Sequence, residues 1–242
     1  MNRNFVFISN RVSSILSALL TEFSDSFVAF VFIARKGNQQ EVDINSAASR
    51  LLTYGIPLHI VTEEYLKSDI FLHYLRSLNL DFLIVHSLHF LLPQRMLDLP
   101  RLSCLNLHPS LLPAYRGPDP WFWQYFDELK TSGFTVHKMS PKEDAGDILS
   151  QQKFPMNYTM KQSTFSEKML EEIGAPLLCR TILNYDNIVP VRQTECKKNR
   201  RARSIIDYCN DPELKCMSSR QKNIINTVYP GLLGKKRETT SK

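Results

Sequence analysis

An asparagine and a histidine, Asn106 and His108, stand two residues apart in a short apolar run. Side chains at this spacing on a strand point to the same face, so both could act on one group. An amide can donate to a developing oxyanion, and an imidazole can donate a hydrogen bond or move a proton. The pair is therefore a candidate for acyl-transfer chemistry. The structural alternative is a packed histidine beside an asparagine that forms a turn.

The loop after His108 and a later aspartate bear on this interpretation. The loop contains Pro109 and Pro113 and ends at Gly117, residue types that fix the path of the backbone. Asp144 begins the run Asp-Ala-Gly-Asp-Ile. A carboxylate near the imidazole would orient the ring or stabilise its charged form.

Apolar runs alternate with helical patterns through the first half of the chain. Strands are predicted at 5–9, 27–33, 58–61, 81–85 and 104–108, and helices at 13–23, 43–54 and 68–78. This alternation predicts an α/β fold with a doubly wound, mostly parallel sheet. Ligands bind beyond the carboxyl ends of the strands in such sheets, so we expect the site at 86–93 and 108–117.

The pattern changes after Gly133. Two strands are predicted at 134–139 and 148–152, and a long amphipathic helix follows at 160–185, interrupted at Gly174 and Pro176. The rest of the chain is polar and too short to bury a core of its own.

We therefore expect a main domain, residues 1–186, and a short basic C-terminal extension, residues 187–242. From Cys196 onward the chain has twelve Lys or Arg and four acidic residues, a net charge of +8. The whole chain carries +6, so the residues before Cys196 carry −2. Such a tail either binds nucleic acid or is a solvated surface. We expect it to pack on the main domain or on a second subunit, with residues 234–242 disordered.

Composition argues against several classes of protein. No stretch approaches the ~20 apolar residues of a membrane span, and the first residues lack the order of a signal peptide. We therefore expect a cytoplasmic protein without a membrane partner. The five cysteines form no C-x-x-C pair, so we expect reduced thiols and no metal site.

The twelve residues from Asn106 to Gly117 resemble the signature of the folate-dependent formyltransferases. This family includes methionyl-tRNA, glycinamide ribonucleotide and sugar N-formyltransferases. The resemblance covers roughly residues 5–185 and includes the segments 81–85, 91–93, 133–137 and 144–149. It implies the Rossmann-like formyltransferase fold, with residues 1–186 as the catalytic domain.

The resemblance also implies a role for each of three residues. Asn106 would hold the formyl oxygen and the oxyanion that forms as the amine attacks. His108, protonated in that state, would share the charge. Asp144 would pair with His108 and help to take the proton from the attacking nitrogen, through a water. The reaction would be a direct transfer from N10-formyl-tetrahydrofolate through a tetrahedral intermediate, without a covalent enzyme adduct or a metal.

The same resemblance places the pterin of the folate against an apolar run. The expected folate-binding residues are Leu88, His89, Phe90, Leu91 and Leu92, with Ser140 and Glu143 on the other side. The alternative is that this run is core beside a strand end. Both can hold, because pterin pockets are apolar walls with a few polar groups.

The amine acceptor differs between branches of the family. The purine branch grips a phosphate with a Gly-Ser-rich loop, but residues 9–14 contain no glycine. The tRNA branch carries a separate C-terminal domain and a small residue after the histidine, whereas Pro109 follows His108 here. The sugar branch keeps this proline and has a short tail. We therefore expect a nucleotide-linked (dTDP-type) amino sugar and a homodimer. The alternatives are methionyl-tRNA and a folate- or nucleic-acid-binding relative without activity.

The candidate substrate contacts are Arg11, Tyr115, Arg116, Trp123 and His137. Arg11, among hydroxyl side chains, could hold an anion. The aromatic run 118–126 begins at an expected helix start, and aromatic faces stack on bases and sugar rings. Helical spacing assigns Phe122 and Phe126 to the core and leaves Trp123 for the substrate.

Overall fold

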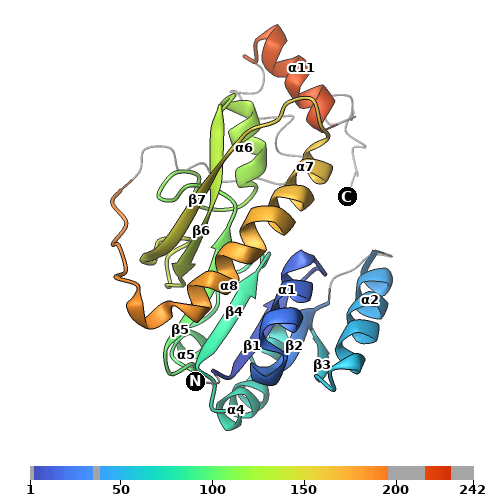
Figure 1. Ribbon diagram of the computed structural model, residues 1–242, viewed down its shortest axis with the longest axis vertical. Helices are drawn as coiled ribbons and strands as arrows, with labels where there is room; N and C mark the ends of the chain where they lie inside the picture. The colour runs from blue at the N-terminus through green and yellow to red at the C-terminus, as the bar shows by residue number, and fades with distance from the viewer. Residues whose placement is uncertain (1–2, 35–38, 196–215, 230–242) are drawn as a thin grey trace, which may run out of the picture.

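A seven-stranded sheet forms the centre of the protein, in the order β3-β2-β1-β4-β5-β6-β7 (Figure 1). The structure is a computed structural model that describes residues 3–34, 39–195 and 216–229. Strands β1 to β5 run parallel to one another, whereas β6 pairs antiparallel with both of its neighbours, β5 and β7. The strands are β1 Phe5–Ser9, β2 Phe27–Ile33, β3 Leu58–Val61, β4 Phe82–His86, β5 Ser103–His108, β6 Thr131–Lys138 and β7 Ile148–Pro155. The chain builds the sheet outward from β1 in both directions, which confirms the predicted doubly wound α/β fold.

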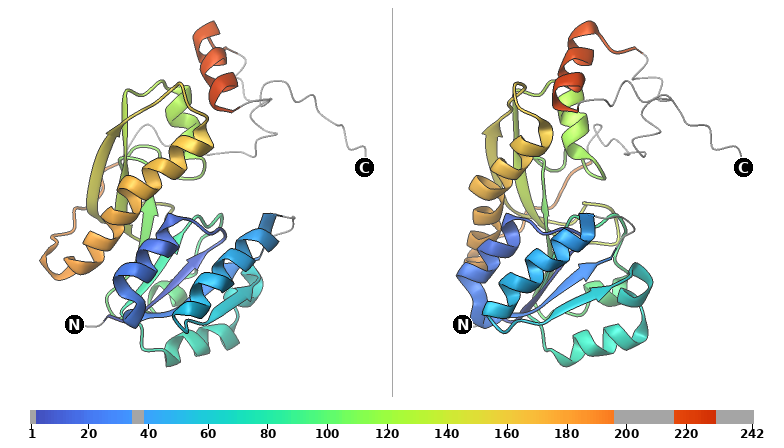
Figure 2. Two further views of the ribbon diagram at one scale, coloured as in Figure 1. Left: turned by 45° about the vertical axis from the view of Figure 1, so that its right-hand side comes forward. Right: turned by 90° about the vertical axis from the view of Figure 1, so that its right-hand side faces the viewer.

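Each face of the sheet has its own layer of helices (Figure 2). In β1, Phe5 and Phe7 join one core cluster, while Val6 and Ile8 join the other, because side chains alternate along a strand. The first cluster includes side chains of α1 Ser14–Phe23, α2 Gln39–Thr53 and α8 Ala175–Leu183. The second includes side chains of α3 Glu63–Leu66, α4 Asp69–Ser77 and α5 Gln94–Leu97. Burial on both faces explains the nearly continuous apolar runs of the central strands.

The long helix predicted at 160–185 is present as three consecutive pieces. These are α7 Gln162–Met169, the π-helical turn η2 Leu170–Gly174 and α8. Pro176 lacks a backbone N–H, and the wider turn just before it adjusts the hydrogen-bond ladder to that loss. Gly174 allows a close approach to the sheet, since a Cβ there would lie 3.2 Å from the ring of Phe134.

The chain after the 3-10 turn η3 Tyr185–Asn187 returns to the sheet. Val191 exchanges two backbone hydrogen bonds of 2.8 Å with Ile148, the first residue of β7. Residues 188–195 therefore lie against the sheet of the main domain.

A last helix, α11 Ser219–Val228, packs on α6 Pro120–Phe126. Ile225 and Val228 are buried, and Gln221 Nε2 donates to the Phe126 carbonyl at 3.0 Å. The expectation of disorder at 234–242 concerns residues outside those described.

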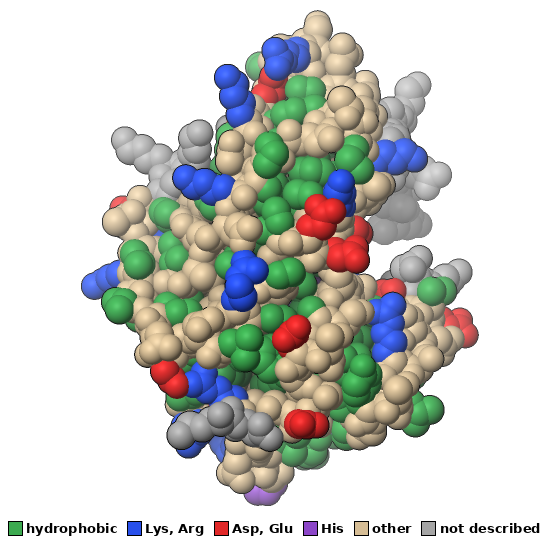
Figure 3. All heavy atoms as spheres, in the orientation of Figure 1, with side chains coloured by type: hydrophobic (Ala, Val, Ile, Leu, Met, Phe, Trp, Pro, Cys, Tyr) green, Lys and Arg blue, Asp and Glu red, His purple; other side chains and the backbone are tan. Residues whose placement is uncertain are grey.

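The surface drawn in Figure 3 mixes Lys and Arg side chains with acidic and apolar ones. Within the described ranges, no helix is long and apolar enough to cross a membrane. The same ranges contain no cluster of three His, Cys, Asp or Glu that could hold a metal ion. One further 3-10 turn, η1 Ser24–Ser26, connects α1 to β2.

Candidate active site

Asn106 and His108 lie on β5, the last parallel strand, next to the first antiparallel one. The strand register pairs Asn106 with His137 and His108 with Thr135. The loop 139–147 then joins β6 to β7 and carries Asp144 to the same place. One strand and one loop therefore bring the three expected catalytic side chains together, and β6 adds His137 beside them.

The distances define a compact polar cluster. Asn106 Nδ2 lies 3.3 Å from Asp144 Oδ1 and 3.0 Å from His137 Nε2. His108 Nδ1 lies 3.4 Å from Asp144 Oδ2, and His137 Nε2 lies 3.5 Å from Asp144 Oδ1. The side chain of Asp144 is 16% exposed and those of His108 and His137 are 6% and 2% exposed. Asp144 is thus the member of these three that is most open to solvent.

His108 is held between two hydrogen-bond acceptors. Its Nε2 lies 2.8 Å from the Tyr115 carbonyl, so this nitrogen carries a hydrogen and donates. Its Nδ1 faces the Asp144 carboxylate. Burial lowers the pKa of His108, while the charge of Asp144 opposes that shift. The His108 ring is therefore neutral in the free protein at neutral pH, and its Nδ1 can accept a second proton.

Asp144 is held as an anion by its neighbours. Burial works against its ionisation, but the nearby His108 and His137 rings and the Gly117 N–H outweigh it. They hold the pKa of the Asp144 carboxyl well below its usual range. The Gly117 N–H donates to Oδ2 at 2.9 Å, which also ties the loop after His108 to the loop 139–147.

Buried hydrogen bonds fix the loop after His108. Thr135 Oγ1 donates to the Ser110 carbonyl at 2.6 Å, and Ser110 Oγ donates to the Ala114 carbonyl at 2.7 Å. Gln124 Nε2 donates to the Pro109 carbonyl at 2.8 Å. This rigid loop presents the Tyr115 carbonyl to His108 and the Gly117 N–H to the carboxylate.

The segment expected to hold the folate lies outside helices and strands, at the end of β4. Leu88 and Phe90 are partly buried against the second core cluster, and Leu92 is buried. His89 and Leu91 are exposed. This run thus contains both buried core residues and an exposed apolar side chain, a mixture compatible with a folate-binding wall and with core packing beside a strand end.

The start of the loop 139–147 packs against the same core cluster as this segment. Met139 packs against the same core cluster, and its N–H donates to the Cys104 carbonyl at 2.9 Å. Ser140 Oγ donates to the Lys142 carbonyl at 2.8 Å within the loop, and Glu143 is exposed. One of the two expected folate-binding segments thus follows the carboxyl end of β4, and the other begins beside Cys104, near the start of β5.

Comparison with known families bears directly on this arrangement. A family model described as formyl transferase matches residues 3–181. The chain belongs to the formyl transferase family. The matched span contains all four polar residues of the cluster and ends before the segment 188–195.

Curated relatives of this chain include two methionyl-tRNA formyltransferases. The protein from Ehrlichia canis (strain Jake) is 33% identical over 168 residues, which cover 66% of this chain and 54% of that protein. The protein from Caldicellulosiruptor saccharolyticus is 37% identical over 141 residues, which cover 58% and 45%. The chain thus spans about half the length of the curated relatives it matches.

Solved structures share the fold at lower identity. A 4-N formyltransferase from Francisella tularensis superposes with a TM-score of 0.68 at 18% identity, covering 93% of this chain and 87% of that one. HypX from Aquifex aeolicus, in complex with tetrahydrofolic acid, gives 0.63 at 16% identity, covering 94% and 34%. These likenesses establish the formyltransferase fold.

Tyr115 and Trp123 lie in the core, which corrects the expectation that their rings contact the substrate. Tyr115 is 4% exposed, and its hydroxyl donates to Asp127 Oδ2 at 2.8 Å. Trp123 is 3% exposed and packs edge-on against the ring of Phe126. The prediction from helical spacing took only one face of α6 to be covered. In the structure α11 packs on this helix as well, so nearly all of the side chains of α6 are buried.

The two expected arginines lie at the surface in contacts with other side chains. Arg11 forms an ion pair with Glu167 of α7. Arg116 Nε donates to Gln193 Oε1 at 2.8 Å, and its Nη2 donates to the Thr194 carbonyl at 3.1 Å. The contact of either arginine with a substrate stays a prediction.

Gln193 is a residue near the cluster that sequence reasoning missed. Its Nε2 donates to the carbonyls of Asp144 and Gly146, at 2.9 and 2.6 Å. The residue stands in a polar stretch without periodicity, so no sequence pattern marks it.

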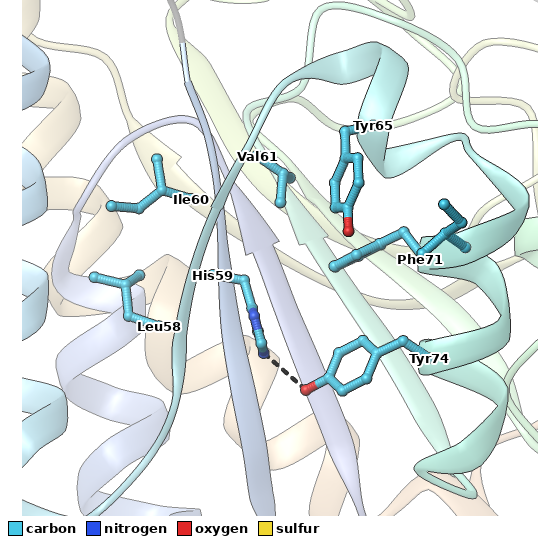
Figure 4. Close-up of a pocket in the computed structure, with 8 residues that line it drawn as sticks. Leu58, His59, Ile60, Val61, Tyr65, Phe71 and Tyr74 are labelled. Atoms are coloured by element: carbon cyan, nitrogen blue, oxygen red, sulfur yellow. Dashed lines mark hydrogen bonds between the residues drawn. The ribbon is translucent and has the colours of Figure 1, made fainter.

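An open hollow of about 420 Å³ lies on the far edge strand, β3 (Figure 4). His59 Nε2 and the Tyr74 hydroxyl form a 2.7 Å hydrogen bond in it. The residues that line it are Leu58, His59, Ile60, Val61, Tyr65, Ile70, Phe71 and Tyr74. None of the expected site residues is among them.

Gly146 lies where a side chain would collide with the neighbouring strand. A Cβ at this position would be 1.8 Å from the Lys138 carbonyl oxygen. We expect Gly146→Ala to displace the loop that carries Asp144, lowering turnover and costing about 1–3 kcal/mol of stability. Urea denaturation and turnover would measure both effects. The control is Gly55→Ala, where no atom lies within 4 Å but φ is +65°, so it should lose stability without losing turnover. Unchanged turnover in Gly146→Ala would contradict the prediction.

His86 makes folding sensitive to mild acid. It is 7% exposed at the end of β4, and burial, helped by the charge of Arg11, lowers its pKa to about 3. The pKa of the ring in the unfolded chain is close to 6.5, the ordinary value for histidine, so the unfolded state binds more protons between these two values. Stability therefore falls as the pH drops through that window.

We expect the wild type to lose about 2 kcal/mol more stability than His86→Gln between about pH 7 and pH 5. Urea denaturation at both pH values would measure the difference. The control is His73→Gln, at an exposed position on α4, which should follow the wild type. Equal losses in wild type and His86→Gln would contradict the prediction.

Proposed function

We propose that this chain transfers a formyl group from N10-formyl-tetrahydrofolate to an amine. The observation that carries the proposal is the convergence of Asn106, His108 and Asp144 at the carboxyl end of β5. Family membership supports the reaction class, and the order of the three residues in the chain resembles that of the folate-dependent formyltransferases.

Asn106 supplies the oxyanion donor. Its amide nitrogen is partly buried and makes a long contact of 3.3 Å to Asp144 Oδ1, with His137 Nε2 at 3.0 Å. An oxygen that gains negative charge would compete well for that hydrogen, because charge-assisted hydrogen bonds are stronger. Preorganised donors of this kind stabilise charge that develops in a transition state.

Asp144 and His108 handle the proton of the attacking amine. Asp144 is ionised and is the more exposed of the two, so it can receive a proton directly or through a water. His108 Nδ1 faces the same carboxylate, so a proton on the ring would be stabilised by that charge. The imidazolium would then share the negative charge held by Asn106.

The residues that follow β4 fit a folate. Leu88 and Phe90 form an apolar wall, Leu91 is exposed, and the backbone there lies outside regular structure. Flat heteroaromatic rings bind in apolar clefts with a few polar groups. Bound there, the folate would supply the formyl carbon. As the amine nitrogen bonds to that carbon, the bond from the carbon to N10 would break, and the proton taken from the amine through Asp144 could pass to N10 of the departing tetrahydrofolate.

We propose a nucleotide-linked amino sugar as the acceptor. Pro109 follows His108, as in the sugar branch that the sequence resembles. The structural likeness to the 4-N formyltransferase covers 93% of this chain and so reaches beyond the matched family span. A homodimer is part of this proposal.

Methionyl-tRNA is the second candidate, because the sequence relatives at 33% and 37% identity carry that name. The +8 charge from Cys196 onward would suit an RNA backbone. Most of that charge lies in residues outside those described.

A turnover assay separates the candidates. Purified protein would be mixed with N10-formyl-tetrahydrofolate and either nucleotide-linked 3- and 4-amino sugars or Met-tRNA, and release of tetrahydrofolate measured. Turnover with an amino sugar alone supports the proposal. Turnover with Met-tRNA alone would show that the acceptor is Met-tRNA and not an amino sugar. Folate binding without turnover on either acceptor would overturn both proposed acceptors and leave the amine to be found among others.

A further inference from the structure

The segment 188–195, beyond the span that matches the family, reaches the active-site cluster. Val191 is anchored by its paired backbone hydrogen bonds to Ile148, both 2.8 Å long. Two residues later, the half-buried side chain of Gln193 points back to the loop that carries Asp144. The backbone pairing therefore sets the position from which Gln193 acts.

The side-chain amide of Gln193 both donates and accepts hydrogen bonds. Its NH₂ group donates to the carbonyls of Asp144 and Gly146, and its oxygen accepts from Arg116 Nε at 2.8 Å. Since the two carbonyls can only accept and the guanidinium can only donate, the orientation of the amide is determined. One side chain thus joins the Asp144 loop to the loop that follows His108.

The loop that Gln193 holds needs external support. Asp144 has a φ of +44°, a conformation that costs free energy for a residue with a side chain. Gly146, two residues later, lies so close to Lys138 that a Cβ would not fit. Such backbone persists only where surrounding contacts fix it, and the two bonds from Gln193 bracket this turn.

We propose that Gln193 is a positioning residue for Asp144, through which the segment after the family domain completes the active site. Gln193 touches no reacting atom. It holds the Asp144 backbone so that the carboxylate stays beside His108 and on the Gly117 N–H. The consequence for turnover rests on the proposed formyl transfer, whereas the positioning itself does not.

Two variants of the full chain test the proposal. Gln193→Ala removes the amide, and Gln193→Met removes it while keeping most of the volume. The matched control is Arg192→Ala, which alters the exposed neighbouring side chain. The readout that needs no substrate is amide hydrogen exchange at Gly117, whose N–H is held by Asp144 Oδ2. Exchange at Met139, which donates to the Cys104 carbonyl, reports on general loosening.

We expect Gly117 to exchange at least about tenfold faster in both Gln193 variants, with Met139 unchanged and Arg192→Ala like the wild type. We also expect kcat to fall by about 10- to 100-fold while KM for the folate changes little, because a small misplacement of a reacting group is costly. Wild-type exchange at Gly117, or equal acceleration at Met139, would overturn the proposal. If the wild type transfers no formyl group, the proposed function fails, and the exchange result still decides the role of Gln193.

Discussion

Replacement of Asp144 by asparagine should lower kcat by about 10²–10⁴-fold, the usual cost of losing a general acid or base. The asparagine keeps an oxygen that can accept from the Gly117 N–H, so the loop should stay in place. What it loses is the negative charge that opposes the lowered pKa of His108. Without that charge, the ring has no anion to stabilise its protonated form, and the amine has no carboxylate to take its proton.

Steady-state turnover with the acceptor found in the assay above would measure this effect, with Asp144→Ala as the more severe change. Thermal unfolding of each variant would show whether the fold is intact. Asp69→Asn is the matched control, since Asp69 is 89% exposed and paired with Arg95 at the surface of α4. Turnover within twofold of wild type in Asp144→Asn would remove this residue from the mechanism.

Replacement of Asn106 by alanine should lower kcat by about 10²–10³-fold, the range for losing one oxyanion donor. The donor acts on charge that develops only in the transition state, so the effect should appear in kcat more than in KM. Asn106→Asp is the more informative variant. It has nearly the same shape, but it places a second carboxylate against Asp144 and against the developing negative charge, so it should be at least as inactive as the alanine variant.

The test of the Asn106 variants is kcat and KM for both substrates, together with the affinity for the folate measured by fluorescence quenching. The expected pattern is nearly normal folate binding with strongly reduced turnover. Ser77→Ala, at an exposed position on α4, serves as the surface control. A large rise in KM with an unchanged kcat would mean that Asn106 binds substrate in the ground state instead.

The fold follows from patterns that lie within single segments. The five parallel strands and their helices are visible because both faces of each central strand are covered, which produces apolar runs bounded by turn residues. Asn106 and His108 lie on one strand face at a spacing that sequence alone indicates. Family resemblance added Asp144, whose loop is brought to β5 by the β6 register.

The remaining features depend on contacts between distant segments. Trp123 is buried because α11, which begins at Ser219, covers α6, and the spacing within α6 contains no trace of that. Gln193 acts through one amide placed by the pairing of Val191 with Ile148. A single polar residue in a polar stretch has no periodicity, so a pattern cannot single it out.

The four polar residues of the cluster lie on both sides of one seam in the sheet, the boundary between the parallel strands and the antiparallel hairpin β6–β7. Asn106 and His108 belong to the parallel side, whereas His137 and Asp144 belong to the hairpin or its loop. A hairpin is local in sequence, and such units can open as cooperative segments at a lower free energy than global unfolding. Detaching this one would pull the carboxylate away from the imidazole while the five-stranded parallel layer stayed intact. Heat inactivation would then precede melting of the protein, and its temperature would report the strength of the β5–β6 seam.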